Sequence, residues 1–165
     1  FVFIGQQQAG EAQSRFMARM RAAFARRGLD FANHGGILPR LSKARFLGAL
    51  RLADVLLDTP GWSGCNSTLA AVACDLPVVT TPTALMRGRP SAAILACMGL
   101  PHRVAADLDD YVAQAVRLAD PAERAAFRAE LRAGRGRVFG DTAPVRALED
   151  FLADVVRSGC AGFSR

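Results

Sequence analysis

Small residues with hydroxyl and amide groups gather in one loop of this chain, where their chemistry suits a phosphate. Residues 58–68 read Asp-Thr-Pro-Gly-Trp-Ser-Gly-Cys-Asn-Ser-Thr and stand between an apolar run and a segment with helical periodicity. Gly61 and Gly64 allow close approach of the backbone, and a helix N-terminus presents unpaired N–H groups at the positive end of its dipole. We expect a diphosphate to bind these N–H groups together with the hydroxyls of Ser67 and Thr68.

A second loop with suitable chemistry follows the next apolar run. Residues 81–89 carry Arg87 and Arg89, whose guanidinium groups can neutralise a phosphate. Both loops also have a purely structural interpretation. Asn66 or Ser67 can cap a helix, and the arginines can bind backbone carbonyls.

The elements around these loops follow an alternating order. The expected strands are residues 1–4, 36–38, 55–57, 77–80 and 103–105, and the expected helices are 11–27, 42–50, 67–74 and 90–98. Strands that alternate with helices of this length form parallel sheets, and runs that are apolar throughout indicate strands covered on both faces. We therefore predict an α/β fold with a doubly wound, Rossmann-like parallel sheet, in which both loops lie at the carboxyl edge where ligands bind.

The last third of the chain predicts a helical C-terminus. Residues 109–119, 121–133 and 144–157 have helical periodicity, and Asp-Pro-Ala-Glu at 120–123 is a helix start signal. We expect one domain over 1–157 and a flexible tail over 158–165. Because the sequence opens directly in a strand, we expect it to be part of a longer protein.

The basic charge of the chain does not indicate nucleic acid. The net charge is +6, but all except one of the 21 basic residues are arginines spread along amphipathic segments, and one Tyr and one Trp offer little stacking surface for bases. No apolar run reaches the roughly 18 residues of a membrane span, and the start lacks the charged region of a signal peptide. We expect a cytoplasmic protein with neither a nucleic-acid nor a membrane partner.

The cysteines and histidines lack the spacing of a metal site. They are Cys65, Cys74, Cys97, Cys160, His34 and His102. No Cys-x-x-Cys pair occurs, so we expect free cysteines in a reducing compartment and no metal.

From Phe1 to about Val156, and most densely over 39–100, the chain resembles the O-linked N-acetylglucosamine transferases and their SPINDLY-type bacterial relatives. In that family a Gly-x-Thr-Thr type motif follows a Leu-Ala-Asp-Val strand, and its hydroxyls and amides hold the donor diphosphate. The corresponding residues here are Gly-Cys-Asn-Ser-Thr at 64–68. Residues 39–43, Pro-Arg-Leu-Ser-Lys, resemble the family element that lies against the nucleobase.

The resemblance also covers individual positions. Phe46 falls where a ring stacks on the base, and Arg89 falls at a family arginine. The resemblance thus assigns nucleotide-sugar binding to Leu41, Lys43, Phe46, Gly64, Cys65, Asn66, Ser67, Thr68 and Arg89. Two of these have a plainer interpretation, Lys43 as a solvated side chain and Phe46 as a core residue.

Three positions depart from the family pattern. Cys65 replaces a histidine of the animal enzymes, Ala70 replaces an acidic residue that binds the ribose, and Pro90 replaces a histidine of bacterial relatives. The family glutamine and lysine that bind the donor phosphates lie upstream of the strand at which this sequence begins. The acceptor-side half of the enzyme is likewise outside it.

The resemblance implies the donor-binding C-terminal half of a GT-B glycosyltransferase, which moves N-acetylglucosamine from UDP-GlcNAc to Ser or Thr hydroxyls of an acceptor protein or peptide. The family chemistry inverts the sugar and needs no metal or cofactor. Neither histidine falls at a family catalytic position, so no catalytic base is assigned. The implied partners are the N-terminal catalytic half and helical repeats of the same polypeptide, and we expect this piece to be inactive alone.

Two alternatives stay open on the sequence. A related protein glycosyltransferase would use GDP-fucose or UDP-glucose as its donor. A non-catalytic interaction domain would keep the fold without the site, and Ala70 and Cys65 favour that interpretation.

Overall fold

A computed structural model describes residues 1–5 and 10–162 of the 165-residue chain, and side-chain surroundings as far as residue 158. The chain divides into two compact units. We call Phe1–Ala49 the N-terminal unit and Leu50–Arg165 the C-terminal unit, and each is described by itself.

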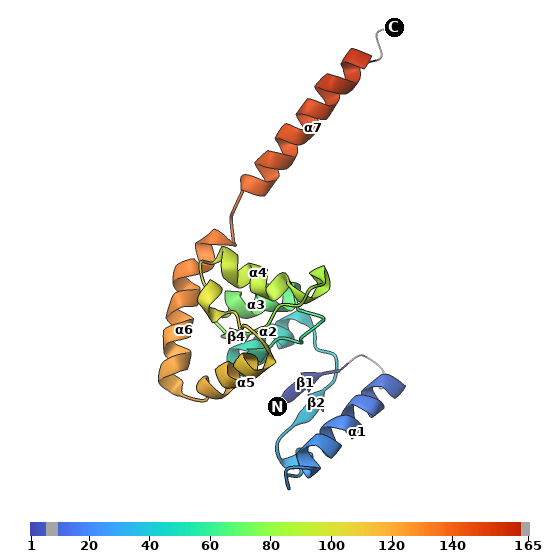
Figure 1. Ribbon diagram of the computed structural model, residues 1–165, viewed down its shortest axis with the longest axis vertical. Coiled ribbons are helices and arrows are strands. Elements are labelled where there is room, and N and C mark those ends of the chain that lie inside the picture. The colour runs from blue at the N-terminus through green and yellow to red at the C-terminus, as the bar shows by residue number, and fades with distance from the viewer. Residues whose placement is uncertain (6–9, 163–165) are drawn as a thin grey trace. The chain divides into compact units, whose positions relative to one another are not determined.

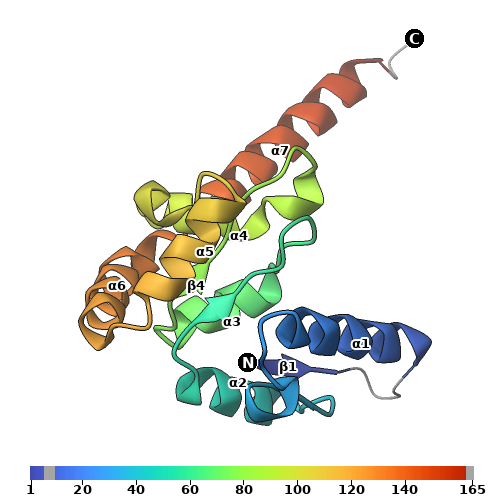
Figure 2. The same cartoon turned by 60° about the horizontal axis from the view of Figure 1, so that its bottom comes forward.

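The N-terminal unit is a small parallel sheet covered by one helix. Strands β1 (Val2–Ile4) and β2 (Gly36–Leu38) pair in parallel, and α1 (Glu11–Ala25) and a short 3-10 helix, η1 (Phe31–Asn33), connect them (Figure 1). Figure 2 shows α1 along β1, and rings join the two elements, with the Phe3 and Phe16 centroids 4.9 Å apart. Helix α2 (Lys43–Leu52) follows and runs across the boundary of the unit.

The C-terminal unit contains a second βαβ crossover. Strands β3 (Leu56–Leu57) and β4 (Val78–Val79) pair in parallel, and α3 (Asn66–Ala73) connects them. After β4 come η2 (Met86–Gly88), α4 (Pro90–Cys97) and η3 (Pro101–Arg103). The strands are short and fully apolar. Both residues of β4 are buried, as expected for a strand covered on both faces, whereas Leu57 of β3 is 39% exposed.

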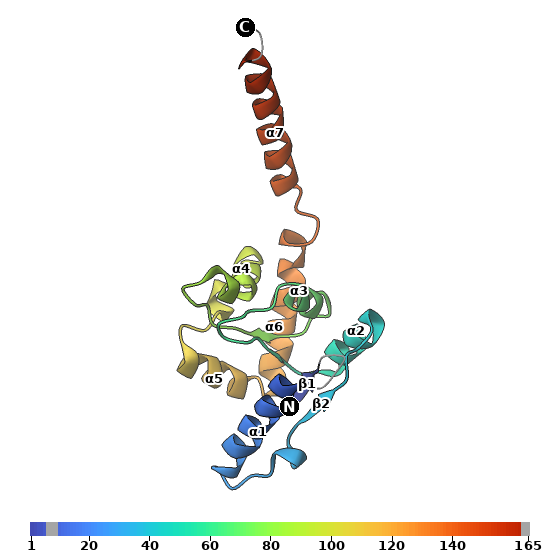
Figure 3. The same cartoon turned by 90° about the vertical axis from the view of Figure 1, so that its right-hand side faces the viewer.

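Further helices complete this unit: α5 (Leu108–Arg117), α6 (Pro121–Gly134), η4 (Arg135–Arg137) and α7 (Ala143–Gly162). Figures 1 and 3 show α6 along one side of the layer that holds α3 and α4. The approach is close, since a Cβ at Gly134 would lie 2.5 Å from the Met98 carbonyl oxygen. Glycine at the end of α6 therefore permits this packing.

The buried core of the C-terminal unit consists of β4 and of apolar residues on or next to the surrounding helices. Its fully buried apolar residues include Val72, Leu76, Val78, Val79, Leu95, Met98, Phe127 and Leu131. Ion pairs tie α6 to the loops around this core. Asp75 accepts from Arg132 and Arg135, and Glu130 accepts from Arg103 at 2.6 Å.

The strand expected at 103–105 is wrong. Pro101 starts the 3-10 helix η3 at this point, and the sheet contact is reduced to one hydrogen bond of 2.9 Å from the Ala105 N–H to the Thr80 carbonyl. Proline removes a donor and fixes φ, which favours a helical turn over a paired strand. In the described part of the chain the paired strands form two two-stranded sheets, whereas we expected one continuous sheet.

Other expectations agree with the structure to within a few residues. The Asp120 side chain accepts from the Ala122 N–H at 2.9 Å, which confirms the helix start at 120–123. At the C-terminus, α7 continues to Gly162, past Ser158, where we expected the tail to begin. The domain expected over 1–157 stays a prediction. No described helix is both long and apolar enough to cross a bilayer.

Candidate functional site

The backbone of the loop between β3 and α3 passes close to the side chain of Ser67, in the first turn of α3. A Cβ at Gly64 would lie 2.3 Å from Ser67 Oγ, so only glycine allows this approach. Cys65 and Asn66 are exposed next to it, and Ser67 is half-buried. The loop thus presents backbone and small polar side chains at the start of α3.

The first turn of α3 has free backbone N–H donors and no side chain that caps them. Neither Asn66 nor Ser67 caps the helix, because α3 begins at Asn66 itself and its N-cap residue Cys65 makes no side-chain hydrogen bond. In the described chain, the N–H groups of residues 65–68 donate no hydrogen bond. Free donors at the positive end of a helix dipole suit a phosphate.

Under this loop lies a buried carboxylate. Asp58 is only 5% exposed and accepts three short hydrogen bonds, each of 2.7 Å, from the Ser63 hydroxyl, the Thr80 hydroxyl and the Gly64 N–H. A buried charge is tolerated when donors surround it in this way. Asp58 therefore fastens the loop to the end of β4.

Three hydroxyls, those of Ser63, Thr68 and Ser91, extend this network, and we call them the hydroxyl clamp. All three residues are buried. Ser91 Oγ lies 2.9 Å from Ser63 Oγ and 2.6 Å from Thr68 Oγ1, and it donates to the Gly64 carbonyl at 2.9 Å. The Ser91 N–H in the first turn of α4 donates to Ser63 Oγ at 3.0 Å. The clamp thus joins the loop to α4.

The second loop lies against the first. The Ser63 N–H donates to the Arg87 carbonyl at 2.8 Å, and the Arg87 guanidinium lies 5.7 Å from the centre of the Trp62 ring. Trp62 is 72% exposed. The two loops that the sequence places at the carboxyl edge are therefore in contact.

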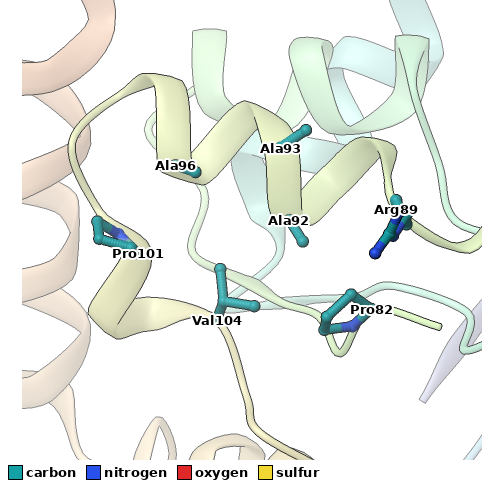
Figure 4. A pocket seen from close by; sticks show the side chains of 7 residues that line it. All are labelled: Pro82, Arg89, Ala92, Ala93, Ala96, Pro101 and Val104. Carbon is teal, nitrogen blue, oxygen red and sulfur yellow. The ribbon is translucent and has the colours of Figure 1, made fainter. Parts of the chain in front are cut away.

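An apolar hollow lies beside this pair of loops. It is open and has a volume of about 490 Å³, and its lining is Pro82, Arg89, Ala92, Ala93, Ala96, Pro101 and Val104. Figure 4 shows Arg89 at one end and Pro101 at the other, with the alanines of α4 between them. Apart from Arg89 it is apolar, so the free N–H groups of α3 suit a phosphate better than this hollow does.

The predicted site residues fall in both units. Gly64, Cys65, Asn66, Ser67, Thr68 and Arg89 lie in the C-terminal unit, and Leu41, Lys43 and Phe46 in the N-terminal unit. Lys43 is exposed in the first turn of α2, and Phe46 is half-buried one turn later. Arg89 is exposed, whereas Thr68 is fully buried and bonded within the clamp.

Sequence reasoning missed the network beneath the loop. Asp58 and Thr80 directly follow the neighbouring strands β3 and β4, and Ser91 is the second residue of α4. A polar residue directly after an apolar strand is a weak signal that could have identified the first two. Nothing in the sequence relates Ser91 to Gly64, which is 27 residues away.

One ionisable group beside the network has a strongly shifted pKa. The Tyr111 hydroxyl donates to the Asp58 carbonyl at 2.9 Å. Burial, with the nearby Asp58 charge, raises the pKa of Tyr111 to about 12. Among the described residues no three His, Cys, Asp or Glu side chains stand close enough together to hold a metal ion.

The sequence model of glycosyl transferase family 41 matches residues 21–139, which is most of the chain and includes every loop described above. The chain belongs to this family. It is 36% identical over 76 residues to the UDP-N-acetylglucosamine–peptide N-acetylglucosaminyltransferase of Caenorhabditis elegans, a match that covers 46% of this chain. It also matches the structure of a mutant O-GlcNAc transferase of Thermobaculum terrenum, with a TM-score of 0.74 and 29% identity over 93% of this chain.

Both relatives are much longer than the matched region. The matches cover 7% of the Caenorhabditis protein and 29% of the Thermobaculum chain. The family membership and the fold likeness confirm the resemblance to O-linked N-acetylglucosamine transferases that the sequence motifs indicate.

Proposed function

We propose that this chain is the donor-binding part of a protein glycosyltransferase, a C-terminal GT-B half that holds UDP-N-acetylglucosamine for transfer to Ser or Thr hydroxyls. Family membership and the two named relatives support the reaction class. The observation that carries the donor-binding role is the row of unpaired N–H groups at residues 65–68, next to a glycine that permits close approach.

In this proposal the diphosphate lies at the N-terminus of α3. When the bond to the sugar breaks, negative charge grows on the departing diphosphate, and fixed N–H donors at the positive end of a helix stabilise that charge. Ser67, half-buried beside Gly64, adds a hydroxyl. In this proposal no metal is required for the reaction.

The proposed role does not include binding of the acceptor protein. Glycosyl transfer needs the acceptor hydroxyl held in line with the anomeric carbon, and much of the rate enhancement comes from that positioning. This chain spans 29% of the Thermobaculum chain. We therefore expect UDP binding without transfer when UDP-N-acetylglucosamine and a Ser/Thr peptide are added to this chain alone.

Calorimetry with UDP tests the donor-binding role. Ser67→Ala should weaken UDP binding by about 1–3 kcal/mol, because it removes a hydroxyl bond to a charged ligand. Ser14→Ala, an exposed serine on α1, is the matched control and should bind as the unmodified chain does. Equal affinities for Ser67→Ala and the control would place the diphosphate elsewhere.

A gain of affinity tests the pose of the ribose. Ala70 is half-buried one turn into α3, where the family commonly has an acidic residue. Ala70→Glu should strengthen UDP binding by about 1.5–3 kcal/mol, through an ionised acceptor for the ribose hydroxyls, and should leave binding of inorganic phosphate unchanged. A parallel titration with GDP identifies the base, since tighter GDP binding would favour a GDP-sugar donor.

A further inference from the structure

The Gly64 carbonyl is held inside the protein by two hydroxyls from different helices. Ser91 Oγ donates to it at 2.9 Å from α4, and Thr68 Oγ1 lies 3.2 Å from it in α3. Both side chains are fully buried. A carbonyl that lies in the interior between two buried hydroxyls, and accepts a proton from them, has a fixed direction.

The hydroxyl protons of the network show how Ser91 and Thr68 act together on the carbonyl. Ser63 has a single hydroxyl proton, and its 2.7 Å bond to the Asp58 carboxylate uses it, because an ionised carboxylate only accepts. Ser63 Oγ then accepts from the Ser91 N–H. The Ser91 and Thr68 hydroxyls then have two protons between them: one lies in their 2.6 Å contact, in which either oxygen can donate, and the other is donated to the Gly64 carbonyl.

The direction of this carbonyl determines the direction of the next amide. No cis peptide occurs among the described residues, and in a trans peptide the C=O and the following N–H point in opposite directions. With the Gly64 carbonyl turned inward, the Cys65 N–H points outward. It joins the N–H groups of Asn66 and Ser67, which also have no acceptor in the described chain.

We propose that Thr68 and Ser91 are positioning residues, which hold the Gly64–Cys65 peptide so that the amides of residues 65–67 face the donor diphosphate. The proposal rests on the donor-binding function above and assigns Thr68 a role different from the direct contact expected from the sequence. Asp58 anchors the clamp through Ser63. Asp58 also carries charge, so its replacement alters the potential at the site, whereas changes at Thr68 and Ser91 alter only the geometry.

The experiment compares UDP affinity with stability in variants of the full chain. Ser91→Ala and Thr68→Val should each weaken UDP binding about tenfold, roughly the effect of one hydrogen bond to a charged ligand. Thr68→Ser keeps the hydroxyl and should stay within about twofold of the unmodified chain. Leu131→Ala, a fully buried change on α6, should lower the thermal midpoint at least as much and leave the affinity within about twofold.

A second measurement reports the peptide itself without ligand. Amide ¹⁵N relaxation at Cys65 and Asn66 should show increased mobility in Ser91→Ala and Thr68→Val, but not in Leu131→Ala. Unchanged affinity in the two clamp variants, or an equal loss in Leu131→Ala, would overturn the proposal.

The outcomes separate this proposal from the function on which it rests. If the unmodified chain binds no UDP, the donor-binding function fails, and the relaxation data then decide whether the clamp orders the loop. Unchanged mobility at Cys65 in both clamp variants overturns the clamp whether or not UDP binds.

Discussion

The contacts inside the N-terminal unit differ in kind from the contacts inside the C-terminal unit. In the N-terminal unit the described contacts are mainly between rings, with Phe24 and Phe31 centroids 5.1 Å apart and Phe3 and Phe16 4.9 Å apart. Among the residues whose burial the structure describes, the buried polar side chains fall in the C-terminal unit: Asp58, Ser63, Thr68, Thr80, Thr81, Ser91 and Gln114.

The two kinds of contact differ in how strictly they determine the positions of the groups that they join. Ring contacts tolerate small rotations and shifts, because dispersion and burial have little directional preference. Hydrogen bonds to a buried carboxylate weaken steeply when their geometry changes, and each unsatisfied partner is costly. The unit with directional buried contacts is also the one that carries the candidate phosphate site.

The largest loss of stability, and the strongest test of this contrast between the units, is expected at Asp58. Asp58→Leu keeps the branched shape of the side chain but leaves three donors, two of them buried, without an acceptor, and we expect it to lower the free energy of unfolding by roughly 3–5 kcal/mol. Phe31→Leu in the N-terminal unit, also buried, should cost less than about 1.5 kcal/mol. Denaturant unfolding measures both, by Trp62 fluorescence for the first and by far-UV circular dichroism for the second. Similar losses for the two variants would contradict the contrast.

A smaller effect is expected at Asp75, where backbone strain and ion pairs oppose each other. Its φ of 57° lies in the left-handed region, and its carboxylate accepts from Arg132 and Arg135. Asp75→Ala loses the pairs and keeps the strain, so it should cost about 1–2 kcal/mol of stability. Asp75→Gly relieves the strain and should recover at least half of that loss. A glycine variant that is less stable than the alanine variant would show that strain plays no part.

Next in size is the bond from Tyr111 to the Asp58 carbonyl. Tyr111→Phe should lower the free energy of unfolding by about 1 kcal/mol, measured by thermal or denaturant unfolding at neutral pH. Because Tyr111 is the only tyrosine, absorbance at 295 nm follows its titration alone, with an expected pKa of about 12. A pKa raised on folding gives stability that is complete below the unfolded value near 10 and is lost as pH rises toward 12. Titration close to 10 in the folded protein would rule out this buried phenol.

The smallest effect is expected at Glu130, at the surface of α6. The hydrogen bond from Arg103 lowers the pKa of this carboxyl below its ordinary value of 4.5, with a smaller contribution from His102. A lowered carboxyl pKa gives stability that is present above pH 4.5 and is lost as pH falls through the folded value. Glu130→Gln should therefore lose the most stability near neutral pH and approach the unmodified chain in acid. Thermal midpoints measured from pH 7 to pH 3 check this, and a constant difference across that range would contradict it.

Much of the architecture could be predicted from the sequence because local patterns carry it. Apolar runs correctly predict β1, β2, β3 and β4, and the Asp-Pro-Ala-Glu signal at 120–123 places the start of α6. The order of strands and helices places the two polar loops at one edge, and the bond between Ser63 and Arg87 confirms that they meet. These features depend on periodicity and capping, which neighbouring residues determine.

The tertiary structure alone decided how the polar loop is held. The sequence has hydroxyl residues at 63, 67, 68 and 91, and nothing in it distinguishes a buried hydroxyl from an accessible one. In the fold, Thr68 and Ser91 turn into the interior toward the Gly64 carbonyl, while Ser67 stays half-buried beside the free amides. The direction of a side chain depends on residues distant in sequence that meet it after folding, here across 27 positions from Gly64 to Ser91. Local pattern determined the elements, and long-range hydrogen bonding decided which hydroxyls are buried against the backbone of the loop and which stay beside its free amides.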